Sequence, residues 1–213
     1  MSDDGLRDAR LSYTRGTFDE THALAEPVDQ LAAWLADART AGVSEPNALT
    51  LATITQEGTP DARIVLLRGL DANGLVFFTN YESRKGQELA RLPAAAALFY
   101  WPECERQVRI EGAVDKLAAA ESDAYFATRP RGHQLSSWAS PQSRTVADRA
   151  QIEDAMARYD AAFPHEVPRP PYWGGYRLAP VRFEFWQGRA DRVHDRVAYE
   201  RAGGGWQRSR LAP

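Results

Sequence analysis

The chain has 213 residues, and its hydrophobic content of 44% and charged content of 26% are ordinary for a soluble globular protein. This length can bury a sizeable core and fits one domain better than two independent units. The formal net charge of -3 argues against a general nucleic-acid or acidic-membrane surface, because such surfaces carry a basic excess.

Two further features concern the compartment in which the protein works. Cys104 is the only cysteine, so no intrachain disulfide can form, and a reducing compartment fits. The N-terminal segment lacks the apolar core of a signal peptide, and no stretch approaches the ~18 apolar residues that cross a bilayer. We therefore expect a cytoplasmic protein that does not span a membrane.

The first residues are polar and mixed in charge, and we expect a mobile arm over residues 1–20 ahead of a single domain over 21–213. From Pro27, apolar residues recur at helical spacing until Gly42, which predicts a first helix with this glycine as its stop. Short β-rich runs then follow one another at hairpin distances, at residues 48–55, 62–69, 74–80, 94–101 and 106–114.

The second half of the chain mixes helices and strands. Helices are predicted at Ala118–Thr128 and Thr145–Phe163, and Gly203–Gly205 is expected to turn the last hairpin. The remaining β-rich runs lie at residues 174–180, 181–188, 192–201 and 205–213. This order predicts an α+β domain in which helices pack outside an antiparallel barrel of about six strands. Neither a G-x-G-x-x-G turn after a strand nor a Walker A loop is present, so neither standard nucleotide cradle is available.

A turn followed by a helix is predicted after residue 80, and two cations fall in the first helical turn. Ser83 is the expected N-cap, and the next residues, Arg84 and Lys85, oppose the helix dipole. Such a pair is unfavourable unless an anion lies in front of it, so the free backbone N–H groups and both side chains would make a phosphate site. The alternative is that both side chains bend into solvent.

An almost wholly apolar strand carries Arg63 and Arg68, which lie five residues apart and hence on opposite faces if the strand is regular. Either arginine could simply end the strand in water. One cation on each face would otherwise permit two separate anion pockets, because a single phosphate cannot use both faces.

Two polar segments are further candidates for ligand binding. On the run ERQVRIEG, most of one face is expected to be wet, but the Gln107 amide offers a donor and an acceptor to a heterocycle edge. Residues 124–143 gather polar side chains with little apolar periodicity, which is typical of a binding loop. Within them, Tyr125 and Arg129 are four apart and would meet on one helical face, either around a ligand or as a surface contact.

The segment 185–196, FWQGRADRVHDR, ends with Arg192, His194 and Arg196 at every second position. In an extended chain that spacing points all three side chains at one face. The four histidines show no metal-ligand spacing, and no serine lies in a G-x-S-x-G elbow. We therefore predict neither a metal site nor a covalent triad.

Several of these segments occur together in one known family, in the order ARIVLLRG, FFTNYESRKG, ERQVRIEG, YFATRPRGHQLSSWASPQS, YWGGYR, EFWQGRADRVHDR and RLAP. Over Tyr13–Pro213 the chain resembles the pyridoxamine (pyridoxine) 5'-phosphate oxidases, and the R-x-H-D-R block after FWQG is highly specific. The resemblance implies an FMN-binding split β-barrel and a homodimer with the flavin at the subunit interface. It also implies oxidation of pyridoxamine or pyridoxine 5'-phosphate by O2 to pyridoxal 5'-phosphate and H2O2, with NH3 from the amine, by hydride transfer from substrate C4' to flavin N5.

The resemblance also assigns residues to roles. The implied FMN-binding residues are Arg63, Ile64, Val65, Leu66, Leu67, Arg68, Phe78, Thr79, Arg84, Lys85, Gln107, Gln142, Ser143, Trp186 and Arg196. The implied substrate-binding residues are Arg10, Tyr13, Arg68, Tyr125, Arg129, His133, Arg192 and His194, of which Arg192 and His194 are the implied catalytic pair near the substrate ring. The segment Arg10–Tyr13 resembles the family's lid over the bound substrate.

Two residues depart from the family pattern, and both fall in the implied substrate-phosphate pocket. Arg68 stands where lysine is common, and a planar guanidinium does not simply replace a point charge. His133 stands where serine is common, so its contact with a phosphate would depend on its charge. Both departures bear on substrate affinity rather than on the flavin.

Other activities are compatible with the same fold. A split-barrel flavin reductase or a cofactor-F420-dependent relative is one alternative, and a flavin- or pyridoxal-phosphate-binding protein without turnover is another. The reductase alternative would not need Tyr125, Arg129, Arg192 and His194 together.

Overall fold

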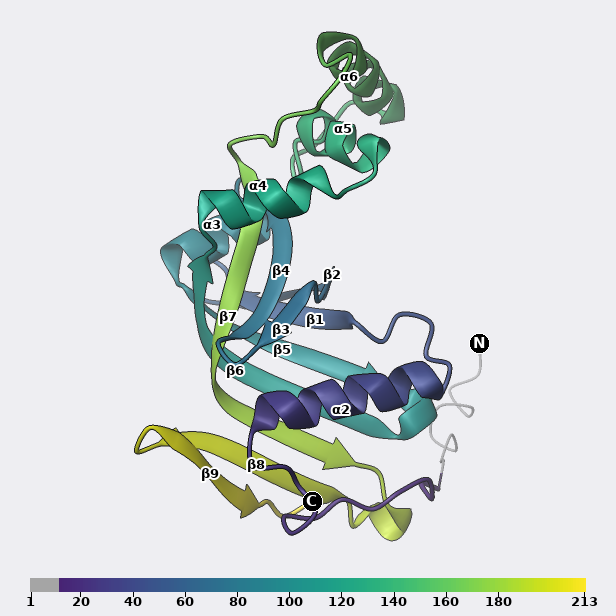
Figure 1. The fold of residues 1–213 in the computed structure, drawn as a ribbon, viewed down its shortest axis with the longest axis vertical. Helices are drawn as coiled ribbons and strands as arrows, with labels where there is room; N and C mark the ends of the chain where they lie inside the picture. Colours follow the sequence, from purple (N-terminus) through teal and green to yellow (C-terminus); the bar gives the residue numbers. More distant parts are fainter. Residues whose placement is uncertain (1–11) are drawn as a thin grey trace. The chain divides into compact units, whose positions relative to one another are not determined.

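The computed structural model describes residues 12–213, and the chain folds into two compact units (Figure 1). Among the described residues, the first unit comprises 12–49 together with Ala97–Ile110 and Val181–Pro213. The second unit comprises Thr50–Ala96 and Glu111–Pro180.

One antiparallel sheet runs through the described residues. Its strands are β1 (Ala48–Ile54), β2 (Pro60–Leu66), β3 (Gly69–Asp71), β4 (Gly74–Asn80), β5 (Ala94–Trp101), β6 (Arg106–Lys116), β7 (Trp173–Gln187), β8 (Asp195–Ala202) and β9 (Gly205–Arg210). They are hydrogen-bonded in the order β2-β1-β5-β6-β7-β4-β3, and β8 pairs with β7 and β9. The antiparallel class is therefore confirmed, but nine strands replace the expected six or so over residues 12–213, because β3 is additional and the β8–β9 hairpin extends the sheet.

Strand β7 corrects the prediction of two runs at 174–180 and 181–188. The chain continues through Pro180 as one strand of 15 residues. Proline lacks a backbone donor, but it does not prevent an extended chain from continuing. The last hairpin is confirmed, because Gly203 and Gly204 have φ values of 56° and 85° between partners Ala202 and Gly205.

In the first unit, helix α2 (Pro27–Thr40) confirms the first predicted helix. Proline at its start needs no hydrogen-bond partner for a backbone N–H, and Gly42 follows its end with φ at 81°. The predicted apolar stripe is its buried face. Trp34 packs edge-on against Phe185 with ring centroids 5.2 Å apart, and against Phe18 at 4.9 Å.

The second unit contains helices α3 (Arg84–Arg91), α4 (Ala119–Ala127), α5 (Arg131–Ala139) and α6 (Arg149–Ala162). The prediction of helices over 118–128 and 145–163 is confirmed, but α5 replaces part of the predicted loop. Helix α5 lies beside α6 (Figure 1) and buries Leu135 in a cluster with Phe126, Val167 and Trp173. Its apolar contacts come from distant segments, which explains why local periodicity did not reveal it.

Short 3-10 turns occupy Pro102–Cys104 and Ala190–Arg192. No helix within residues 12–213 is both long enough and apolar enough to span a membrane.

Close packing at the start of α3 leads to a stability test. A Cβ atom on Gly86 would lie 2.2 Å from the Tyr81 carbonyl oxygen, so backbone would have to move. We expect Gly86→Ala to lower the free energy of unfolding by about 2–3 kcal/mol in reversible denaturation. The control is Gly132→Ala in α5, where a Cβ meets nothing within 4 Å, and which should raise that free energy by about 0.5–1 kcal/mol. Equal effects of the two substitutions would contradict this packing.

Candidate functional site

A cavity of about 590 Å3 in the second unit brings together residues from several parts of the chain. Strands β2, β4 and β7, helices α3, α4 and α5 and the connections next to them each contribute. The lining residues are Ile64, Val65, Leu66, Arg68, Phe78, Thr79, Lys85, Tyr125, Thr128, Arg129, Pro130, His133, Gln142 and Trp173. Eight of the implied FMN-binding residues and four of the implied substrate-binding residues are among them, with Arg68 in both sets.

The charged side chains that line this cavity are all basic. Arg68, Lys85 and Arg129 face the cavity together with His133, and none of the described lining residues is Asp or Glu. Burial lowers the pKa of Arg129, and the like charge of Arg68 lowers it further. Grouped cations without a carboxylate attract anions and hold them by charge-assisted hydrogen bonds.

Lys85 marks one part of this cation group. Ser83 is the N-cap of α3, as predicted, and its hydroxyl accepts a hydrogen bond from the Gly86 N–H at 3.3 Å. The Lys85 ammonium donates to Gln142 Oε1 at 3.0 Å and to Thr79 Oγ1 at 3.3 Å. Burial, followed by the charge of Arg63, lowers its pKa. Over residues 12–213, no carboxylate forms an ion pair with Lys85, so its charge is available to an anion.

Aromatic rings surround the second cation, Arg129. Its guanidinium lies 4.4 Å from the Trp173 ring centroid, and its Nη1 donates to Ser137 Oγ at 2.7 Å. Tyr125 stacks on Phe78 with centroids 3.8 Å apart and an angle of 18° between the rings. The predicted helical pairing of Tyr125 with Arg129 is wrong in detail, because α4 ends at Ala127, yet both side chains line the cavity.

The other two predicted phosphate cations do not line this cavity. Arg63 Nη2 contacts Asp61 Oδ2 at 2.6 Å and Glu88 Oε2 at 3.0 Å. Arg84 Nε contacts Glu88 Oε1 and Asp61 Oδ2, both at 3.1 Å. Arg84 instead lines a separate cavity of about 310 Å3. Consecutive helical residues point about 100° apart, so Arg84 and Lys85 face different surroundings.

The remaining predicted FMN-binding residues of the second unit also fall into two groups, those that line the cavity and those that do not. The structure places Arg68 beyond the end of β2, where it lines the large cavity, whereas Arg63 does not. This arrangement agrees with the predicted separation of the two arginines. Leu67 is buried and Ser143 is exposed, and neither lines the cavity. Sequence reasoning missed Thr128, Pro130 and Trp173 as lining residues, and only the YWGGYR motif at the start of β7 contains the tryptophan.

The first unit holds a second group of predicted residues. The ring centroids of Trp186 and His194 lie 4.6 Å apart, and Tyr13 lies 5.6 Å from Trp186 and 5.7 Å from His194. Arg196 donates from Nε and Nη2 to Glu184 Oε1, at 3.0 Å and 2.8 Å. Gln107 is half-buried on β6, and Arg10 lies outside the described residues.

The predicted common face of Arg192, His194 and Arg196 is wrong. Strand β8 begins only at Asp195, so Arg196 is in the strand while Arg192 and His194 precede it. Asp191 and Arg192 have φ values of 56° and 62°, a left-handed conformation that costs ~1–2 kcal/mol for residues with a Cβ. Alternation therefore cannot explain how the two cations and the imidazole are oriented.

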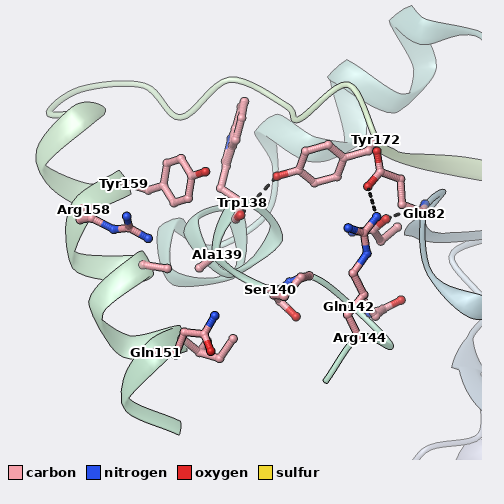
Figure 2. Close-up of a pocket in the computed structure, with 14 residues that line it drawn as sticks. Glu82, Trp138, Ala139, Ser140, Gln142, Arg144, Gln151, Arg158, Tyr159 and Tyr172 are labelled. Atoms are coloured by element: carbon pink, nitrogen blue, oxygen red, sulfur yellow. Dashed lines mark hydrogen bonds and ion pairs between the residues drawn. The ribbon is translucent and has the colours of Figure 1, made fainter. Parts of the chain in front are cut away.

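A smaller cavity of about 260 Å3 adjoins the C-terminal end of α5 and one side of α6 (Figure 2). Gln142 lines it as well as the large cavity, so this amide forms part of both walls. An ion pair between Glu82 and Arg144 at 3.0 Å and a hydrogen bond from Tyr172 Oη to Trp138 O at 3.2 Å border it. Sequence reasoning assigned this cavity no role.

Comparison with known proteins places this arrangement in a family. Residues 35–162 match the family model described as pyridoxamine 5'-phosphate oxidase. Residues 173–213 match the model described as the pyridoxine 5'-phosphate oxidase C-terminal dimerisation region. Among solved structures, PhzG from Burkholderia lata, in complex with tetrahydrophenazine-1-carboxylic acid, has a TM-score of 0.88 at 37% identity, covering 95% of this chain and 100% of that chain.

A more distant FMN-binding protein from Nostoc punctiforme, related to pyridoxamine 5'-phosphate oxidase, has a TM-score of 0.71 at 20% identity, covering 88% of this chain and 98% of that chain. Together these structures confirm the expected split-barrel fold class.

Two full-length relatives are named pyridoxine/pyridoxamine 5'-phosphate oxidase. The protein from Synechocystis is 52% identical over 209 residues, which cover 98% of each chain. The protein from Cupriavidus necator is 53% identical over 209 residues, covering 98% of this chain and 99% of its own. This chain therefore belongs to the pyridoxine/pyridoxamine 5'-phosphate oxidase family of oxidoreductases.

Proposed function

We propose that the protein binds FMN and oxidises pyridoxamine 5'-phosphate and pyridoxine 5'-phosphate with O2. The alcohol would yield pyridoxal 5'-phosphate and H2O2. The amine would consume one water in addition and would also release NH3. The observation that carries the proposal is the large cavity, whose lining combines three permanent or near-permanent cations with stacked aromatic rings and contains no described carboxylate.

The lining fits both ligands in chemical terms. FMN and the two substrates are all aromatic rings that carry a phosphate dianion, so each needs cations at one end and apolar or aromatic surface at the other. When bound, FMN supplies the two-electron acceptor at N5 for the hydride that leaves the substrate C4' carbon, and passes the electrons to O2. The protein must therefore bind the two rings, orient them and exclude water.

Within this proposal, Lys85 holds the FMN phosphate with Thr79 and Gln142. The two side chains already converge on the ammonium, and an arriving phosphate oxygen would complete its set of hydrogen-bond acceptors. Arg63 and Arg84 stay predicted FMN contacts, and each would have to share its guanidinium with Glu88 and Asp61.

Arg129 holds the substrate phosphate together with Arg68, Tyr125 and His133. The guanidinium of Arg129 is oriented by Ser137 and by the Trp173 ring, so little side-chain entropy is lost when a phosphate binds. Arg68 adds a second fork-shaped donor set, which suits phosphate oxygens. His133 offers a further ring N–H donor, and its contact with the phosphate depends on the charge of the imidazole.

Arg192 and His194 act near the substrate ring, and Trp186 and Arg196 contact the flavin. These four residues lie within 173–213, the part of the chain that matches the family's dimerisation region. We infer that the protein is a homodimer and that this region supplies ring contacts to a flavin site at the subunit interface. The family membership also supports a cytoplasmic location.

The experiment begins with an absorption spectrum of the purified protein. We expect a flavin spectrum, bleaching when pyridoxamine 5'-phosphate is added without air, and stoichiometric H2O2 when pyridoxine 5'-phosphate is added in air. A flavin spectrum without bleaching would support the alternative of a flavin-binding protein without turnover. Bleaching only by a nicotinamide or F420 donor would support a reductase, and either result would overturn the proposal.

A further inference from the structure

The segment between β7 and β8 is held in a turn by hydrogen bonds within the segment and by one to Glu105. The Gly188 N–H donates to Glu105 O at 2.7 Å, and the Val193 N–H donates to Ala190 O at 3.2 Å. Between these two bonds, the Arg189 N–H donates to His194 Nδ1 at 3.1 Å. The imidazole is therefore tied to the backbone five residues before it.

This bond determines which ring nitrogen carries the proton. A backbone amide can only donate, so His194 Nδ1 must accept through its lone pair and cannot itself carry a hydrogen. The neutral ring then has its single proton on Nε2. Protonation of Nδ1 would place two N–H groups against each other and would break the contact with Arg189.

The Arg189 side chain secures the amide that makes this bond. Its Nη1 donates to Asp195 Oδ2 at 2.9 Å. Arg189 therefore contacts His194 through its backbone N–H and Asp195 through its guanidinium. Asp195 is 9% exposed and also accepts from the Phe18 N–H at 3.1 Å and from Arg210 Nη1 at 2.9 Å. This carboxylate is thus held by three donors from separate parts of the first unit.

The other groups around the imidazole do not oppose the neutral form. Trp186 and Tyr13 contact it through their rings, at centroid distances of 4.6 Å and 5.7 Å. Burial lowers the His194 pKa, and the nearby charge of Arg192 acts in the same direction because it disfavours a second cation. Asp195, the adjacent carboxylate, is already paired with Arg189 and Arg210.

We propose that Arg189 is a positioning residue that holds His194 as the neutral Nε2–H tautomer, so that His194 presents a hydrogen-bond donor, and not a base, to the ligand. Its partner is an acceptor atom on the substrate ring or its substituents. The identity of that partner rests on the proposed function, whereas the tautomer does not. The structure thereby favours one of two roles for His194, donation of a hydrogen bond over removal of a proton.

The tautomer can be measured directly in the full-length flavin-loaded protein. In 15N-histidine-labelled protein, two-bond 1H–15N correlation spectra distinguish the two neutral tautomers and the imidazolium, and His194→Gln assigns the signal among the four histidines. We expect Nε2–H at pH 7, persisting as the pH falls through the ordinary histidine pKa of ~6.5. An Nδ1–H tautomer, or a charged ring at pH 7, would overturn the proposal even in an active oxidase.

A matched pair of substitutions tests the role in turnover. The amide nitrogen of Gln can occupy the position of Nε2 and donate, whereas the shorter Asn reaches only the position of Nδ1. With a donor role, His194→Gln should retain kcat/KM within about tenfold of the unsubstituted protein, and His194→Asn should lose about 100-fold. A general base would instead lose about 100-fold or more in both variants, since neither amide accepts a proton.

Arg189 is tested by Arg189→Ala with Arg189→Lys as the conservative control. Alanine keeps the backbone N–H but removes the tie to Asp195, so the His194 signal should titrate at higher pH and show both tautomers. Lysine, which can still reach Asp195, should restore the single Nε2–H signal. If Arg189→Ala leaves the tautomer and its titration unchanged in a folded protein, then Arg189 does not position His194.

Discussion

We expect Lys85→Gln to raise the dissociation constant for FMN at least about 30-fold, which corresponds to about 2 kcal/mol of binding free energy. The ammonium is half-buried, and its only described hydrogen-bond acceptors, Thr79 and Gln142, are neutral. Glutamine retains the polarity of the side chain but removes the charge that a phosphate dianion needs. Titration of the flavin-free protein with FMN, followed by quenching of flavin fluorescence, measures the change.

Lys116 provides the control, because it is the only other lysine in the sequence. Its ammonium lies 4.2 Å from the Tyr81 ring centroid and does not line the large cavity. Lys116→Gln should leave FMN affinity within about twofold, since distant exposed charges are screened at physiological salt. Tight binding of FMN to Lys85→Gln would show that Lys85 does not hold its phosphate.

Arg84, next to Lys85, tests whether one or both cations at the start of α3 bind the FMN phosphate. Arg84 is paired with Glu88 and Asp61 and lines another cavity, so Arg84→Gln should weaken FMN binding less than Lys85→Gln does. An equal loss in the two variants would mean that Arg84 leaves its acidic partners when the phosphate binds. The comparison therefore decides whether both predicted cations, or only Lys85, serve the cofactor.

The second large effect is expected at Arg129. Arg129→Leu should lower kcat/KM for pyridoxine 5'-phosphate about 100-fold, or about 2.7 kcal/mol, while the protein retains its flavin. Leucine preserves apolar contact with Trp173 but removes the charge and the donors that face the cavity. Because binding of a remote phosphate also orients the reacting carbon, kcat should fall together with the rise in KM.

Pyridoxine without its phosphate makes this test specific to one contact. Its poor turnover should be nearly the same in the unsubstituted protein and in Arg129→Leu, so the preference for the phosphorylated substrate should collapse. Arg149→Leu is the matched control, because this side chain is 90% exposed and pairs only with Glu153 among the described residues. If both substrates lose activity equally, then Arg129 supports the structure of the site rather than the substrate phosphate.

The cations that line the large cavity are concentrated at one place in a protein that is acidic as a whole. The net charge of -3 includes 29 acidic residues, yet none of the described lining residues of the large cavity is acidic. The nearby acids Glu88 and Asp61 pair instead with Arg63 and Arg84, which do not line this cavity. Two dianionic ligands can then be attracted without a basic surface that would bind nucleic acid.

The sequence by itself determined the local elements. Helix α2 with its terminal glycine, the Ser83 cap, strands β4 and β5 and the last hairpin all follow from side-chain periodicity and from turn residues that act on their neighbours. Family motifs added a set of predicted ligand-binding residues, several of which line the large cavity. These features could be predicted because each depends on a few consecutive residues.

Only the tertiary structure decided which side chains share a cavity. Lys85 meets Gln142, 57 residues later, and Arg84 contacts Asp61 on β2 as well as Glu88 one helical turn further on. Helix α5 likewise forms where Leu135 meets Val167 and Trp173, against the polar character of its segment. The backbone turn that ties His194 to Arg189 replaced the expected strand. At Lys85 and in α5 the deciding free energy comes from contacts between distant segments, which sequence periodicity does not encode.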